Sequence, residues 1–222
     1  MVTVITFLIV LAVGGGAWAA HQARAVSPEE SLSRLKEGNA RYVAGRGERP
    51  RTDAARRRET ALQGQHPFAT VVSCSDSRAP VEILFDQGIG DLFVVRVPGN
   101  VCNADEMAGI EYGMEHLHTP LCVVLGHTHC GAVTSVVTGA PLHGNLAHLV
   151  GNIRHAAVKA RKENPSAPEE VLIEAAVRAN VLQSMGDLLR GSPMIRERVD
   201  QGMAKVLGAV YDIASGAVQW LD

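Results

Sequence analysis

Two short apolar runs in this chain each end in residues that can bind a metal ion. The run 68–73 (FATVVS) is followed at once by Cys74. The run 121–126 (LCVVLG) is followed by His127 and, three residues later, by Cys130. Thiolate and imidazole ligands suit Zn²⁺ in tetrahedral geometry, and three protein ligands with an open fourth position are typical of catalytic zinc. If the two runs form neighbouring strands, these residues predict a catalytic zinc centre.

The same residues allow other interpretations. A His-x-x-Cys spacing is common by chance, and in an exported protein Cys74 and Cys130 could instead pair as a disulfide. Cys122 lies inside an apolar run and is expected to be a small buried hydrophobe, whereas Cys102 has no obvious partner. His129 is adjacent to Cys130, which strains shared coordination, so we expect it at the rim of the site.

The elements that must position these side chains alternate along the sequence. Nearly continuous apolar runs at 68–73, 92–97 and 121–126 are typical of strands that are buried on both faces. Helical patterns at 80–87 and 104–118 lie between them, which predicts parallel strands with right-handed crossovers. Ligands in such sheets bind at the carboxyl ends of the strands. We therefore expect one α/β domain, a mainly parallel β-sheet flanked by helices.

Further helices and two final strands are expected around this core. Residues 27–30 (SPEE) supply an N-cap, a proline and a capping-box glutamate for a first helix. A second, polar helix at about 53–63 follows it, so the two form an N-terminal helical arm. Two more helices are expected at about 145–163 and 168–190. The stretch 203–221 is expected to form two strands around an Ala-Ser-Gly turn.

Composition excludes several classes of protein. The 222 residues are 46% hydrophobic and 20% charged, which suits one globular domain and argues against disorder. The 21 Lys and Arg nearly balance the 23 Asp and Glu, for a net charge of −2, so no nucleic-acid partner is expected. Four cysteines are too few for a disulfide scaffold at this length.

The first 25 residues differ in composition from the domain that follows. Residues 2–20 carry no charge, and small residues at 17–19 and 23–25 offer A-x-A cleavage sites. This pattern predicts a secretory signal peptide, and hence a periplasmic or secreted protein. A membrane anchor is the alternative, because about 20 apolar residues can span a bilayer. We expect a leader at 1–25 and a catalytic domain at 26–222, with membrane contact only if the leader is retained.

The two metal-binding motifs together resemble those of the β-class carbonic anhydrases. They are Cys-x-Asp-x-Arg at 74–78 and Gly-His-x-x-Cys-Gly at 126–131. The resemblance begins in the first helix at 32–42, continues through 67–100 and reaches the C-terminal GAVYDIASGAV at 208–218. It implies a zinc enzyme that converts carbon dioxide and water reversibly into bicarbonate and a proton.

The resemblance also implies the roles of the residues at the zinc. The family's ligands match Cys74, His127 and Cys130, which would hold one zinc ion per chain. Its Asp–Arg dyad matches Asp76 and Arg78. In that dyad the arginine keeps the carboxylate off the metal, so that the carboxylate can orient the attacking water.

Further residues match the substrate pocket of one subgroup of the family. Gln65 would donate a hydrogen bond to the forming bicarbonate, and Phe93 and Tyr112 would line the nonpolar side of the pocket. The other subgroup has a tryptophan where this chain has Val71, so no non-catalytic bicarbonate site is expected. Part of the pocket comes from a neighbouring subunit in this family, which implies a homodimer or homotetramer.

Two other functions are compatible with the same metal ligands. The same site could hydrolyse CS₂ or COS, because access rather than the ligand set would select the substrate. The chain could also be a non-catalytic binding domain that zinc stabilises. Asp76, Arg78 and Gln65 argue against this second alternative, since a structural zinc ion needs none of them.

Overall fold

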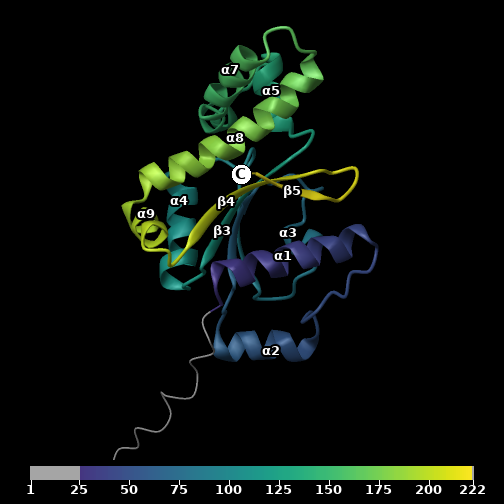
Figure 1. The fold of residues 1–222 in the computed structure, drawn as a ribbon, viewed down its shortest axis with the longest axis vertical. Helices are drawn as coiled ribbons and strands as arrows, with labels where there is room; N and C mark the ends of the chain where they lie inside the picture. Colours follow the sequence, from purple (N-terminus) through teal and green to yellow (C-terminus); the bar gives the residue numbers. More distant parts are fainter. Residues whose placement is uncertain (1–25, 222) are drawn as a thin grey trace, which may run out of the picture.

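A five-stranded sheet is the centre of the fold in a computed structural model, which describes residues 26–221 (Figure 1). The strand order is β2-β1-β3-β4-β5. The first four strands are parallel, and β5 pairs antiparallel to β4. The mainly parallel sheet expected from the sequence is therefore confirmed. The strands are β1 (Ala69–Ser73), β2 (Leu92–Arg96), β3 (Leu121–His127), β4 (Lys205–Tyr211) and β5 (Val218–Leu221).

Helices cover both faces of this sheet and extend beyond its ends. Figure 1 shows α5 and α7 at one end of the molecule and α2 at the other. In chain order the helices are α1 (Pro28–Val43), α2 (Ala54–Gln63), α3 (Val81–Leu84), α4 (Ala104–Glu111), the π-helical turn η1 (Tyr112–His116), α5 (Gly131–Thr138), α6 (Asn145–Leu149), α7 (Ile153–Glu163), α8 (Glu169–Gly191) and α9 (Pro193–Asp200).

Alternate side chains of the central strands pack on opposite faces of the sheet, because side-chain direction in a strand has a period of two. On one face Val71 packs in a cluster with Leu35 of α1 and Leu84 of α3. On the other face Val72 packs in a cluster with Leu188 of α8. All residues of β1 and β3 are buried. This double burial explains why both strands have nearly continuous apolar sequences.

The N-terminal arm begins where its capping residues predict. The Ser27 side chain accepts a hydrogen bond from the Glu30 backbone N–H at 3.1 Å, and Pro28 is the first helical residue. Helix α1 lies very close to α3, since a Cβ at Gly38 would be 1.8 Å from the carbonyl oxygen of Phe85. Helix α2 contains no buried residue and extends away from the sheet.

Several helices differ in extent from the sequence prediction. The helix expected at 80–87 is the single turn α3, and the one expected at 104–118 ends as α4 and continues as η1. The helix expected at 145–163 is interrupted between α6 and α7, where Gly151 disfavours a helical backbone. The helix expected at 168–190 is found as α8 with almost the same bounds.

Two helices were absent from the sequence prediction. Helix α5 (GAVTSVVT) is rich in β-branched residues of low helix propensity, and it is stabilised by tertiary packing through Val133 and Val137. The start of helix α9 was predictable, because a serine followed by a proline is typical of a helix N-terminus. In the structure Ser192 is the N-cap, which accepts a hydrogen bond from the Ile195 N–H, and Pro193 is the first helical residue.

The expected leader at 1–25 lies outside the described residues. Among residues 26–221, none of the helices combines the length and apolar character that crossing a bilayer requires.

Candidate metal centre and active site

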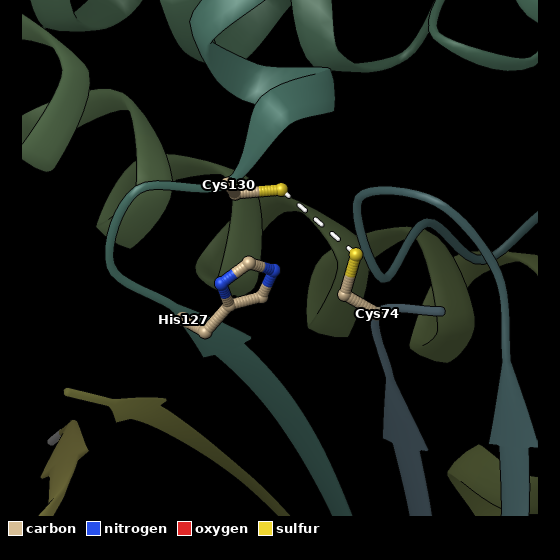
Figure 2. A group of neighbouring side chains, drawn as sticks. All are labelled: Cys74, His127 and Cys130. Carbon is tan, nitrogen blue, oxygen red and sulfur yellow. Dashed lines mark hydrogen bonds between the residues drawn. The ribbon is translucent and has the colours of Figure 1, made fainter. Parts of the chain in front are cut away.

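Three potential metal ligands meet where β1 and β3 end. These strands are parallel neighbours, so their carboxyl ends lie at the same edge of the sheet. Cys74 directly follows β1, His127 is the last residue of β3, and Cys130 immediately precedes α5. Their ligand atoms all lie within 4.8 Å of one another, and Figure 2 shows the side chains pointing toward a common centre. The structure therefore brings the three predicted ligands together.

The two thiols are not joined by a disulfide. The sulfur atoms of Cys74 and Cys130 are 4.0 Å apart, and both cysteines are free and buried. A disulfide requires a separation of about 2 Å between the sulfur atoms. The disulfide interpretation of this pair is therefore not realised in the structure.

The donor atoms suit a metal ion such as zinc. The His127 Nδ1 atom lies 2.9 Å from the carbonyl oxygen of Thr128, which makes Nδ1 the protonated nitrogen. The Nε2 atom is then a free lone pair, and it is buried without a hydrogen-bond partner among the described residues. Such an orphaned nitrogen beside two free thiols is what a tetrahedral zinc ion would satisfy.

The local electrostatics favour deprotonation of Cys74. A hydrogen bond with the Cys130 thiol, together with the nearby His127 ring and the Gly99 N–H, outweighs burial and lowers the pKa of the Cys74 thiol to about 4. The negative charge on Cys74 in turn raises the pKa of Cys130, with which it shares a proton. Burial alone would lower the pKa of His127, but the negative charge of the nearby Cys74 thiolate raises it. A thiolate is thus favoured at the point where a metal cation would bind.

Asp76 and Arg78 form the bidentate pair expected at the rim of the site. Arg78 donates from Nε to Asp76 Oδ1 at 2.9 Å and from Nη2 to Oδ2 at 2.8 Å. The Asp76 Oδ2 atom also lies 3.8 Å from His127 Nε2, so the carboxylate borders the ligand cluster. The hydrogen bonds from Arg78, opposed by partial burial, hold the pKa of Asp76 well below its usual range.

Arg96 is a site residue that sequence reasoning missed. It is the last residue of β2, and it donates from Nε to the Cys74 carbonyl at 3.1 Å and from Nη2 to the Asp76 carbonyl at 2.7 Å. These bonds fix the backbone that carries the first ligand and the dyad. The available signal was a charged residue closing an apolar run, at the same sheet edge as Cys74.

The expected substrate residues do not meet the metal ligands within one chain. Phe93 pairs in register with Thr70, four residues before Cys74, which is about 13 Å along the strand. Tyr112 packs on Phe93, with ring centroids 5.7 Å apart. Gln65 precedes β1 and follows α2, which lies at the end of the molecule opposite α5 (Figure 1). One chain therefore carries two groups of predicted site residues at opposite ends of the same strands.

Comparison with known proteins agrees with this architecture. A sequence profile described as "Carbonic anhydrase" matches residues 69–218. The chain is 34% identical over 194 residues to carbonic anhydrase 2 of Mycobacterium tuberculosis, which covers 86% of this chain and 91% of that protein. It is 36% identical over 197 residues to the carbonic anhydrase of Mycolicibacterium smegmatis, covering 87% and 93%.

The fold also matches solved structures of one class of the family. The structure of the β-carbonic anhydrase CcaA superimposes with a TM-score of 0.68 at 31% sequence identity, covering 86% of this chain and 87% of that chain. The resemblance inferred from the two metal-binding motifs is thus confirmed for both family and class. The chain belongs to the β class of the carbonic anhydrase family, and it catalyses the reversible hydration of carbon dioxide to bicarbonate.

Proposed function

We propose that Cys74, His127 and Cys130 hold one zinc ion per chain as the centre of carbon dioxide hydration. The observation that carries this proposal is the buried, unpartnered Nε2 of His127 beside two free thiols. When bound, zinc supplies the Lewis acidity that generates a nucleophile from water near neutral pH. The residues around the three ligands then have to orient that water, exclude competing ligands and bind the substrate.

Asp76 orients the attacking water in this proposal. Its lowered pKa keeps the carboxylate ionised at physiological pH, so that it can only accept hydrogen bonds. An acceptor next to the ligand cluster fixes the direction in which the water presents its lone pair to the substrate. Arg78 binds both carboxylate oxygens and thereby prevents Asp76 from becoming a fourth ligand.

A second copy of the chain supplies the substrate side of the pocket. Gln65 of one copy would donate from its amide to the bicarbonate oxygen at the metal ligands of the other copy. Phe93 and Tyr112 would give that pocket a nonpolar wall for carbon dioxide. An edge strand supports this assembly, since β2 ends the sheet and its residues 93–95 are only partly buried. The absence of tryptophan at Val71 further predicts no non-catalytic bicarbonate site.

Metal content and hydration measured together test the metal centre. The purified protein should contain about one zinc per chain and accelerate carbon dioxide hydration in stopped-flow measurements. Cys130→Ser should lose most of both. Cys122→Ala is the matched control, because Cys122 is equally buried but lies in the core, away from the ligand cluster.

Other results would favour the alternatives. Bound zinc without carbon dioxide hydration, but with sulfide release from COS or CS₂, would identify a related hydrolase. Bound zinc with no activity on any of these substrates, and a metal that no small anion can reach, would identify a structural site.

We also propose that residues 1–25 direct export, with cleavage after Ala19 or Ala25, so that the catalytic domain acts outside the cytoplasm. The support is the uncharged stretch at 2–20 and the small residues that follow it. Mass spectrometry of the mature N-terminus from the native host tests this proposal. A chain that begins at Met1 and fractionates with membranes would indicate an anchor instead.

A further inference from the structure

A buried hydrogen-bond chain connects α8 to the first metal ligand. Asn180 of α8 is 1% exposed, and its Nδ2 donates to the carbonyl oxygen of Gly99 at 2.7 Å. The backbone N–H of Gly99 donates in turn to the sulfur of Cys74 at 3.3 Å. Asn180 therefore lies two hydrogen bonds from the first proposed ligand without touching it.

The loop between these two bonds is a tight turn. Residues 97–100 (VPGN) form a turn closed by the Asn100 N–H and the Val97 carbonyl at 3.1 Å. Gly99 has φ of +78°, where a type II turn places its third residue after a proline. The turn brings the Gly99 N–H to the Cys74 sulfur.

Contacts with the surrounding helices hold this turn in place. The Asn180 bond fixes the carbonyl on one side of Gly99, and Ile153 of α7 closes the other side, where a Cβ on Gly99 would be 2.5 Å from its Cδ1. Helix α8 also lies close to β3: a Cβ on Gly126, the residue before His127, would be 2.6 Å from Val181 Cγ2. The same turn of α8 thus supports the segments that carry two of the ligands.

We propose that Asn180 is a positioning residue for the metal centre, because it holds the turn whose Gly99 N–H donates to the Cys74 sulfur. This inference rests on the proposed zinc site. A hydrogen bond to a thiolate withdraws electron density from the sulfur, so the turn sets how strongly Cys74 donates to a bound metal. Loss of Asn180 leaves the ligand set intact but changes the character of one ligand.

Cobalt substitution of the full-length protein separates this role from a purely structural one. Co²⁺ bound to thiolates absorbs by sulfur-to-metal charge transfer, at an energy that falls when a thiolate loses a hydrogen bond. In Asn180→Leu, which conserves shape but cannot donate, this band should shift to longer wavelength. The Kd for zinc, measured by competition with a chelator, should rise about tenfold, because the loss of positioning of Cys74 outweighs the stronger donation of its sulfur.

Gln183→Met is the matched control. Gln183 lies one turn further along α8 and also donates to a backbone carbonyl, that of Asn152, at 3.0 Å. Its substitution should lower the Tm to a similar extent and leave both the absorption band and the Kd for zinc unchanged. If Asn180→Leu does not fold, Asn180→Ala is measured in its place.

The outcomes distinguish the failure of each proposal. A folded Asn180→Leu protein with the wild-type band and the wild-type Kd overturns the positioning role. Equal changes in Asn180→Leu and Gln183→Met also overturn it, since they would reflect general loosening of α8. A wild-type protein that binds cobalt without any thiolate band overturns the zinc site itself, and the inference with it.

Discussion

Asp76 is the residue whose carboxylate borders the proposed metal centre, and its hydrogen bonds hold it in that position. Both of its oxygens are held by Arg78, which also donates from Nη2 to the carbonyl of His129 at 3.2 Å. This guanidinium fork is therefore anchored on the segment that carries the second and third ligands. Its geometry leaves the carboxylate bordering the cluster, 3.8 Å from His127 Nε2.

Removing the guanidinium should inactivate the enzyme without removing its metal. In Arg78→Ala the Asp76 carboxylate is free to turn toward the cluster and occupy the open coordination position. We expect hydration to fall by at least about 100-fold while zinc content stays at the wild-type level. Stopped-flow hydration and elemental analysis of the same sample measure the two quantities.

The matched control removes an arginine from a similar ion pair elsewhere on the protein. Arg190→Ala removes a comparable arginine, which binds Asp187 at 2.6 Å on the surface of α8. It should leave hydration unchanged, because the Arg190–Asp187 pair is remote from the ligands. Near wild-type turnover in Arg78→Ala would show that the dyad is only a turn salt bridge.

At the scale of elements, a buried carboxylate holds the loop between α1 and α2. Asp86 is 3% exposed and accepts hydrogen bonds from Arg41 Nε at 2.6 Å and from the backbone N–H groups of Glu48 and Arg49. Burial alone would raise its pKa, but these hydrogen bonds together lower it. The ionised carboxylate thus fixes the loop that leads to α2 and Gln65.

Neutralising this carboxylate should change how stability depends on pH. Because the pKa of Asp86 is lowered by folding, its charge stabilises the fold above its ordinary pKa of about 4 and that stabilisation is lost as pH falls further. Asp86→Asn should lower the free energy of unfolding by about 1–3 kcal/mol at pH 7. The difference from the wild type should shrink below about pH 4, as measured by urea unfolding.

An exposed carboxylate provides the comparison for this experiment. Asp200→Asn alters the residue that ends α9 and should follow the wild-type stability at every pH. A deficit in Asp86→Asn that is equally large at pH 3 and pH 7 would mean that packing, rather than charge, accounts for the loss.

These elements also show what a single sequence can and cannot reveal. The strands and the ligands at their ends are predictable, because double burial produces continuous apolar runs and polar residues then mark the sheet edge. Helix α5 is not predictable from propensity, since Val133 and Val137 are helical only because they pack in the core. Asn180 was missed because its partner, Gly99, is 81 residues away, although a polar residue among apolar neighbours on α8 was a signal.

At the scale of the whole molecule, the proposed function divides each active site between two chains. The ligands and the dyad lie after the carboxyl end of β1, and Gln65 lies before its amino end. If both groups of residues act in one site, a symmetric dimer would form two sites, each from both copies. The family resemblance implied such sharing, and the register of β1 and β2 shows how far apart the halves lie.

Mixed dimers test this division directly. Cys74→Ser and Gln65→Ala should each be nearly inactive alone. When the two are co-expressed in equal amounts, half of the dimers are mixed and one of their two sites is intact, so about a quarter of wild-type hydration should return. Cys74→Ser co-expressed with Arg78→Ala should recover nothing, because both defects lie in the same half-site. Recovery with neither combination would contradict sharing between subunits.

The reactivity of the four cysteines toward a thiol reagent should depend on whether zinc is bound. Burial is the main reason that the pKa of Cys102 is raised to about 12 and that of Cys122 is also raised, so neither should react with a thiol reagent in the folded protein. Cys74, whose pKa is lowered, should become reactive once a bound metal is removed. Titration with a thiol-specific dye should therefore count no groups in the zinc-loaded enzyme, at least one after chelation and four after unfolding. A simple colour reaction would then report, without any enzymatic assay, what fraction of a preparation carries zinc.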